Sequence, residues 1–261
     1  MFESIGFFVL GFIASILAMT SGGEGAIIFV TAFTWIGLDP RVSVGTAFVT
    51  QFFGKSAGTF SWWSVGIYEK DQVVVWRKLA PLFAICISFV IIGMVLIKHL
   101  PGDLIKFIFG IVCIILAYFM IGTRRSWKRK DFPWRKLLKW KEFCCLLLAG
   151  LFTGLIAVGA GALTMYVIHC RRHLDLRRAV ATVVAFLPII TIIGVPIYWP
   201  LVNWEVANFT IVGVIVGGAA GPWISTWLKK TDRTEWIKNI FIGLTLTMGI
   251  GMLASSVLSM V

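Results

Sequence analysis

Long apolar runs alternate with short polar gaps along nearly the whole chain. Dividing the sequence at charged residues and at breaks that contain Pro or Gly predicts ten apolar segments. They cover residues 5–20, 25–37, 42–66, 77–98, 103–122, 143–158, 161–170, 177–199, 205–228 and 235–258. A helix needs about 20 mostly apolar residues to cross the hydrocarbon core. The pattern therefore predicts an all-α polytopic membrane protein.

Two of these segments are too short to cross as ordinary helices. Ten helical residues rise only about 15 Å, against a hydrocarbon core of about 30 Å. Segment 25–37 follows the glycine-rich break SGGEG at residues 21–25, and segment 161–170 follows VGAGA at residues 158–162. We expect short broken or re-entrant helices at both breaks. Segment length favours re-entry for at least one of them, and a full crossing of either stays open.

The second half of the chain repeats the first. An offset of 136 residues aligns Ser21 to Trp63 with the second half without a gap. Matched pairs include Gly23 with Gly159, Gly25 with Gly161, Asp39 with Asp175, Arg41 with Arg177, Thr46 with Thr182 and Trp63 with Trp199. Each half holds five segments, so the second copy enters the membrane in the opposite orientation. We expect one membrane domain made of an inverted repeat, with copies at 1–122 and 143–261 and a basic linker at 123–142.

Charge indicates which side of the membrane each gap faces. Charged residues make up only 14% of the chain, yet the net charge is +12. Of the 24 Lys and Arg residues, 20 lie in the gaps 67–78, 123–142, 171–178 and 229–238. Because positive charge marks cytoplasmic loops, these gaps are predicted to be cytoplasmic and both termini outside. The same distribution argues against nucleic-acid binding and places anionic lipid headgroups beside the basic linker. The first segment lacks a basic region and a convincing cleavage site, so we expect it to remain as a membrane segment.

The glycine-rich breaks are candidate anion sites. Two breaks that enter from opposite faces would place unpaired backbone N–H groups, with their partial positive charge, near the middle of the membrane. Glycine lets the backbone approach a ligand closely. The candidate backbone cradle consists of Gly22, Gly23, Gly25, Gly159 and Gly161. The alternative is that these glycines only let helices pack tightly in lipid.

Lys55 is a cation inside an apolar run, where a charge costs about 2.5–3.5 kcal/mol on insertion scales. Gln51 lies one turn before it and Thr59 one turn after it, so the three can share a helix face. Two roles remain open for Lys55: it binds an anionic substrate, or it pairs with Glu24. Glu24 lies in the first break, and its counterpart in the second copy is Ala160. A carboxylate at that depth is a candidate proton-coupling site, and this role is compatible with an ion pair.

Thr46 and Thr182 occupy equivalent positions early in the long third segment of each half. Their hydroxyl groups are candidates to donate to an oxyanion. Hydrogen bonding back to a carbonyl of their own helix is the commoner fate of Thr in membrane helices. Both interpretations stay open.

No pattern in the sequence points to an enzyme or a cofactor. The five cysteines show no CxxC spacing and no pairing with the three histidines at ligand distance, so we expect no metal site. The chain has no GxxxxGK[ST] motif for ATP hydrolysis and no recognisable set of catalytic residues in the membrane. We therefore expect neither a catalytic residue nor a cofactor.

Taken together, these features resemble the TauE/SafE permeases, also called the sulfite exporter or TSUP family. The resemblance rests on a glycine-rich break, an apolar stretch, the text DPRVSVGT and a glycine-containing third segment, all repeated after a basic linker. It covers nearly the whole chain and is most specific at 11–63 and 147–199. The family break is closer to GxGGG, which carries over to Gly22, Gly23 and Gly25, whereas Glu24 departs from it.

The resemblance implies a carrier in the bacterial or archaeal cytoplasmic (inner) membrane for small sulfur-containing anions, such as sulfite, thiosulfate or organosulfonates. With the repeat, it predicts a secondary transporter that works by alternating access. Glu24 remains the candidate residue for coupling to protons. The direction of transport stays open. The alternatives are an anion channel and a membrane partner or assembly protein with no transport of its own.

Overall fold

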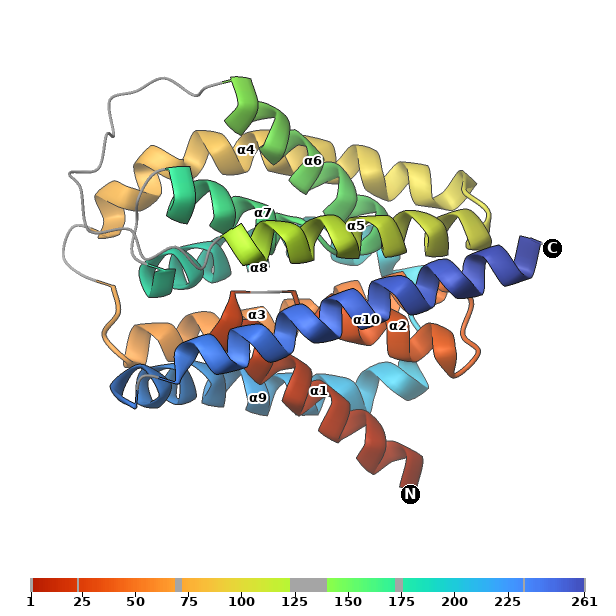
Figure 1. Cartoon of the computed structure of the whole chain (residues 1–261), viewed down its shortest axis with the longest axis horizontal. Coiled ribbons are helices and arrows are strands. Elements are labelled where there is room, and N and C mark those ends of the chain that lie inside the picture. Colours follow the sequence, from red (N-terminus) through yellow and green to blue (C-terminus); the bar gives the residue numbers. More distant parts are fainter. Residues whose placement is uncertain are drawn as a thin grey trace.

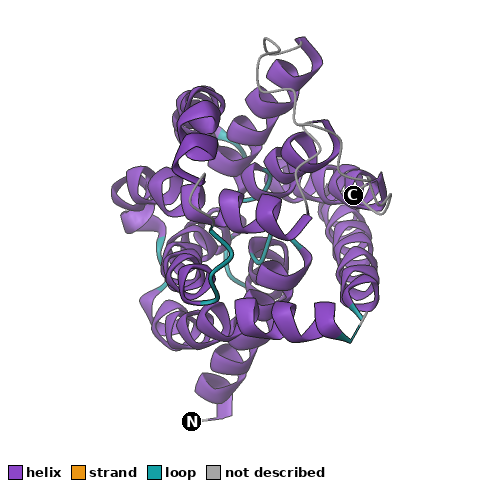
Figure 2. Ribbon diagram, turned by 90° about the vertical axis from the view of Figure 1, so that its left-hand side faces the viewer, coloured by secondary structure: helices purple, strands orange, loops and turns teal. Residues whose placement is uncertain are grey.

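The chain folds into a bundle of helices. The computed structural model describes residues 2–22, 24–68, 72–122, 140–171, 176–231 and 233–260, so Gly23 and residues 123–139 of the basic linker lie outside the described residues. Every regular element of the described chain is helical, as Figure 2 shows. The α-helices are α1 (Phe2–Ser21), α2 (Ala26–Trp35), α3 (Pro40–Ser64), α4 (Gln72–Leu96), α5 (Gly102–Gly122), α6 (Trp140–Ile156), α7 (Ala160–Tyr166), α8 (Leu176–Tyr198), α9 (Trp204–Lys230) and α10 (Thr234–Met260). Short 3₁₀ turns at Ile97–His99 and Trp199–Leu201 follow α4 and α8, and a π-helical turn at Val167–Arg171 follows α7.

These ten helices of the described chain match the ten predicted segments, which confirms the all-α prediction. Five of them are long and apolar enough to cross a membrane: α1, α5, α8, α9 and α10. The two short helices, α2 with 10 residues and α7 with 7, lie where the glycine breaks predicted them. The inverted repeat stays a prediction, as does the division of the chain at the linker.

Local sequence signals set the helix ends. The Asp39 carboxylate accepts a hydrogen bond from the Arg41 N–H at 2.8 Å and caps α3, with Pro40 in its first turn. The Asn203 side chain caps α9 in the same way, by accepting from the Val206 N–H at 3.2 Å. Gly37 follows α2 with φ of 97°, a left-handed conformation that glycine adopts at little cost. The breaks between helices therefore follow directly from residue type.

Small residues let the long helices pack backbone to backbone. The helix α1 packs along α9, α4 along α6, and α5 along α10, while α3 lies against α9 and α8. At Gly213 in α9, an added Cβ would stand 2.2 Å from the Phe8 carbonyl oxygen of α1. At Gly154 in α6, it would stand 1.9 Å from the Val90 carbonyl oxygen of α4. Such contacts exclude any side chain, which is how helices associate tightly in lipid.

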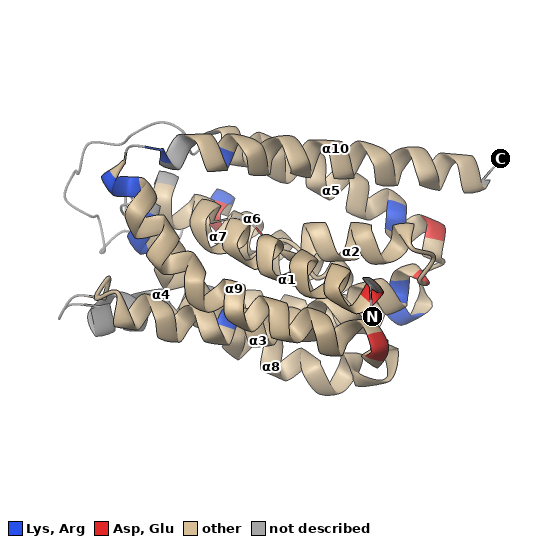
Figure 3. Cartoon of the chain, turned by 90° about the horizontal axis from the view of Figure 1, so that it is seen from below, with Lys and Arg blue, Asp and Glu red and all other residues tan. Residues whose placement is uncertain are grey.

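Both termini lie at one end of the bundle (Figures 1 and 3). The C-terminal end of α9, whose last turn contains Lys229 and Lys230, lies at the opposite end (Figure 1). At that end Tyr68, just beyond α3, donates its hydroxyl to the Ala181 carbonyl of α8 at 2.9 Å. Burial raises the pKa of the Tyr68 phenol well above its usual value, so it donates as the neutral form. The short helices α2 and α7 begin in the interior, where Ala26 and Ala160 are fully buried, and α2 ends at the surface, where Trp35 is 56% exposed.

Candidate functional site

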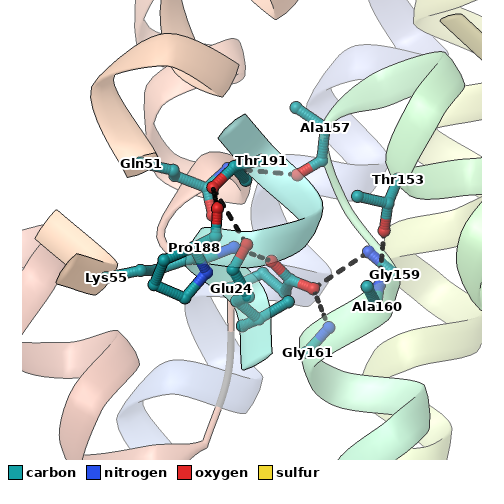
Figure 4. Close-up of polar contacts among 11 residues, drawn as sticks. Glu24, Gln51, Lys55, Thr153, Ala157, Gly159, Ala160, Gly161, Pro188 and Thr191 are labelled. Carbon is teal, nitrogen blue, oxygen red and sulfur yellow. Dashed lines mark hydrogen bonds and ion pairs between the residues drawn. The ribbon is translucent and has the colours of Figure 1, made fainter. Parts of the chain in front are cut away.

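The two glycine breaks meet inside the bundle. In the first break, Gly22 follows α1 with φ of 72°, and Gly25 precedes α2. In the second break, Ala157 follows α6 with φ of 61°, and Gly159 precedes α7 with φ of 139°. These left-handed residues turn the chain sharply, so that the next short helix begins in the interior. Figure 4 shows the polar contacts that join the two breaks.

The Glu24 carboxylate of the first break is bound by the backbone of the second. Its Oε1 accepts hydrogen bonds from the Gly159 N–H at 3.1 Å and from the Gly161 N–H. The Glu24 residue is fully buried. The N–H of the intervening Ala160 donates instead to the Thr153 hydroxyl at 2.5 Å. The backbone of the second break therefore binds an anion, and this anion is the protein's own carboxylate. Binding of a substrate by Gly159 and Gly161 stays a prediction.

Lys55 completes the charge balance of this carboxylate. Its Nζ lies 3.2 Å from Glu24 Oε2, and the two side chains are 7% and 0% exposed. Breaking a buried pair of this kind leaves an uncompensated charge, which is strongly unfavourable. The ion pair that the sequence left as one of two roles for Lys55 is therefore present. Binding of a substrate by Lys55 stays a prediction.

Gln51 holds the second break from the other side. Its Nε2 donates to the Ala157 carbonyl at 3.1 Å, across 106 residues of sequence. Ala157 is the one described non-glycine residue with positive φ. A non-glycine residue in this conformation costs about 1–2 kcal/mol. The bond from Gln51 therefore supports the strained residue that ends α6.

A small pocket lies beside Lys55. The volume that the centre of a water-sized sphere can occupy in this pocket is about 30 Å³. A cavity needs about 10–15 Å³ of this volume to hold one water molecule. The pocket thus has room for about two water molecules or one compact oxyanion. Its walls come from α1, α2, α3, α8 and α9 and from the break before α2. They are formed by Ser15, Ala18, Met19, Gly25, Phe29, Gln51, Gly54, Lys55, Val184, Leu187 and Val214. Apart from Ser15, Gln51 and Lys55, the side chains are apolar or absent.

The structure brings most of the predicted site residues together. Gly25, Gln51 and Lys55 line the pocket, while Gly159 and Gly161 bind Glu24 next to it. Gly22 belongs to the first break, as Glu24 does. A Cβ added to Gly22 would stand 2.7 Å from a methyl carbon of Val180, so the absence of a side chain lets the break pack against α8.

The two predicted threonines do not line the pocket. The pocket lining does not include Thr46 or Thr182 among the described residues. The Thr46 hydroxyl accepts from the Asn203 N–H at 3.0 Å, and Thr182 is buried in α8. Roles for both in substrate binding stay predictions. Gly23 lies outside the described residues.

Sequence reasoning missed two residues of this region, Thr153 and Ser15. Thr153 accepts from the α7 backbone, and the Ser15 hydroxyl donates to the Val214 carbonyl at 3.2 Å. Each is a polar residue within an apolar segment, less than three turns before a break, and this signal could have identified them. In the described ranges no group of three or more His, Cys, Asp or Glu residues gathers at a distance suited to a metal ion.

Comparison with known proteins identifies the family. The family model described as sulfite exporter TauE/SafE matches residues 7–252. A curated relative from Sinorhizobium sp, named probable membrane transporter protein ORF9, is 23% identical over 223 residues, which are 82% of this chain and 80% of the relative. No solved structure gives a significant match. Because the family model spans nearly the whole chain, this multi-pass membrane protein belongs to the TauE/SafE family of membrane transporters.

Proposed function

We propose that this protein is a secondary transporter that moves a small sulfur-containing anion, such as sulfite, thiosulfate or a small organosulfonate, across the cytoplasmic membrane. The observation that carries the proposal is Lys55, a buried cation on the wall of a pocket that is otherwise mostly apolar. A cation in apolar surroundings attracts an anion strongly, because little water is present to screen the two charges. The start of α2 at Gly25 adds partial positive charge to the same pocket.

Proton coupling through Glu24 follows from the charge balance of the site. Lys55 and Glu24 together are neutral, so an arriving monoanion meets a carboxylate next to the cation that it needs. Two unit charges of like sign at 4 Å repel by about 4 kcal/mol at an effective dielectric constant of 20. Protonation of Glu24 removes this repulsion and releases Lys55 for the anion. We therefore propose that one proton accompanies each anion.

The inverted repeat provides the moving parts for alternating access. Under the 136-residue offset, α1 corresponds to α6, α4 to α9 and α5 to α10. The packing of α1 on α9 then maps onto that of α6 on α4, and the α5 and α10 pair maps onto itself. One pair breaks this correspondence, because α3 packs on α9 more extensively than α8 packs on α4. Transport that alternates between two sides requires such a difference between repeats in any one state.

The distribution of charge supports a cytoplasmic location for the end of the bundle that carries Lys229 and Lys230. The position of both termini at the opposite end fits the proposed sidedness. Labelling with a membrane-impermeant thiol reagent in a cysteine-free background tests it. A cysteine at the exposed position Lys98 should react from outside intact cells, and one at the exposed position Lys229 should not. The reverse pattern would contradict the orientation.

Transport is tested by uptake in proteoliposomes. We expect saturable uptake of at least one of sulfite, thiosulfate and sulfoacetate, which is faster with an inward proton gradient. Lys55→Met should abolish uptake, and Glu24→Gln should make it insensitive to the gradient. Thr245→Val, which removes a buried hydroxyl bonded only within α10, is the control and should keep uptake. Saturable uptake of a non-sulfur carboxylate alone would refute the sulfur assignment. Flux that does not saturate with substrate concentration would indicate a channel. The absence of any flux would indicate a membrane partner protein that does not transport.

A further inference from the structure

The polar groups that line the pocket are of two opposite kinds. Lys55 Nζ is a cationic donor with no acceptor capacity, and one of its hydrogens is directed to Glu24 Oε2. Gln51 and Ser15 are the other two polar side chains in the wall. What these two can offer a ligand is fixed by the bonds they already make.

Gln51 offers an acceptor. Its Nε2 donates to the Ala157 carbonyl at 3.1 Å, and only the NH₂ end of an amide can bond to a carbonyl oxygen. This bond fixes the orientation of the amide. The Oε1 at the other end is buried and has no hydrogen-bond partner among the described residues. The whole side chain is nearly buried, since the residue is 4% exposed. A buried acceptor without a partner is rare and unfavourable, by about 1–3 kcal/mol.

While it keeps the hydrogen bond that it makes in the structure, Ser15 also offers only an acceptor. Its hydroxyl hydrogen is directed to the Val214 carbonyl of α9, at an Oγ to oxygen distance of 3.2 Å. What remains on Ser15 Oγ is acceptor capacity. The pocket thus combines one cation with two hydrogen-bond acceptors, and a ligand that matches it is negatively charged and also carries a hydrogen on oxygen or nitrogen.

We propose that the anion bound in this pocket must carry its own hydrogen-bond donor. The inference rests on the proposed function and narrows its substrate class. It selects hydrogen oxyanions, such as hydrogen sulfite, and small sulfonates with an amino or hydroxyl group next to the acidic group. The acidic oxygens face Lys55, while the donor satisfies Gln51 Oε1. An anion without a donor, such as thiosulfate or an alkyl sulfonate, leaves Gln51 Oε1 unpaired or brings oxygen against oxygen, and it binds more weakly.

Sulfamate and methanesulfonate separate this requirement from size and charge. Both carry the same SO₃⁻ group, and they differ by an NH₂ group in place of a CH₃ group of similar volume. Both remain monoanions throughout the neutral and mildly acidic range, so protonation of Glu24 affects them alike. The experiment measures how each inhibits the uptake of radiolabelled sulfite into proteoliposomes. We expect half-inhibition by sulfamate at a concentration about tenfold lower, the factor that corresponds to one satisfied buried acceptor.

Variants assign the preference to its residue. Gln51→Met removes the acceptor and keeps the side-chain length, so the tenfold ratio should fall to about one. Ser15→Ala lacks the second acceptor and should lower the ratio of the two half-inhibition concentrations in part. It replaces Gln51→Met as the test if that variant does not fold. Thr245→Val leaves the pocket intact and should keep the ratio of the wild-type protein.

Two results would overturn the inference while the transport proposal stands. One is equal inhibition by both anions in the wild-type protein, and the other is a ratio that persists unchanged in both pocket variants. If no sulfur anion is taken up and neither compound binds, both the inference and the proposed function fail.

Discussion

The buried pair of Glu24 and Lys55 makes a quantitative prediction about stability. Glu24→Gln keeps the shape of the side chain and removes its charge. The amide oxygen can still accept from the Gly159 and Gly161 N–H groups, but the NH₂ group then faces Lys55 Nζ, donor against donor. Lys55, whose side chain is 7% exposed, is left without a counter-ion. We expect Glu24→Gln to lower the free energy of unfolding by about 3–5 kcal/mol, as for other buried pairs that lose one partner.

The reciprocal change should cost less. Lys55→Met removes the cation and keeps much of the hydrocarbon stem. The Glu24 carboxylate keeps both backbone N–H bonds, so part of its charge is still stabilised. We expect a loss of about 3 kcal/mol, at the lower end of the range for buried pairs. The double variant contains no buried charge at this site, and it should be more stable than the sum of the two losses predicts, by about 2–3 kcal/mol.

The assay is a double-mutant cycle on the purified protein in detergent micelles. Free energies of unfolding come from denaturant titrations, and thermal unfolding serves as a second measurement. Thr245→Val is the control for the loss of a buried polar group that lies outside the site. If the two single losses simply add in the double variant, Lys55 and Glu24 do not stabilise one another, and the electrostatic account of the site is wrong.

Three further predictions concern backbone contacts. In Gly161→Ala, the new Cβ would stand 2.8 Å from Glu24 Oε1, so the carboxylate must leave its cradle, and we expect a loss of about 1–3 kcal/mol in unfolding free energy. Ala157→Gly removes the strain of a non-glycine residue at φ of 61°. We expect it to raise the free energy of unfolding by about 0.5–1 kcal/mol, and the thermal midpoint with it. Gly213→Ala would place a Cβ 2.2 Å from the Phe8 carbonyl oxygen and separate α1 from α9, at a cost of about 1–3 kcal/mol measured by denaturant titration.

Gly243 provides the matched control for the two glycine substitutions. An added Cβ there meets no atom within 4 Å, so Gly243→Ala should be neutral or stabilising by up to about 1 kcal/mol. An equal loss in Gly243→Ala and Gly213→Ala would contradict the packing account of α1 and α9. A lower thermal midpoint in Ala157→Gly would show that its left-handed conformation is not a source of strain.

Much of the fold was predictable because each helix is specified locally. Runs of apolar residues give the long helices, since backbone polar groups in lipid must be paired within the segment. Residues such as Asp39 with Pro40, and Gly37, set the ends from their immediate neighbours. The predicted boundaries therefore differ from those of the structure by at most a few residues, except at the start of α4 and where the π-helical turn follows α7.

The components of the candidate site were predictable, but its contacts were not, apart from the ion pair of Lys55 with Glu24, which was one of two roles left open for Lys55. Glu24, Gln51 and Lys55 were recognisable because polar groups in an apolar run are costly. The residue that Gln51 binds, Ala157, lies 106 positions away in the chain, and no local pattern identifies it. Thr46 and Thr182 were chosen because they occupy equivalent positions in the two copies of the predicted repeat. Neither is among the described residues that line the pocket.

The sequence by itself determined the all-helical membrane class, the position of the two glycine breaks and the presence of a buried cation, because apolar length, glycine and charge act through local physics. Only the tertiary structure decided that the anion in the second break is Glu24, which lies 135 residues from Gly159. It also decided that Lys55 faces both this carboxylate and the pocket. The contact of Glu24 with the second break joins the two halves of the chain. It depends on how small residues let the helices pack, which no single segment encodes.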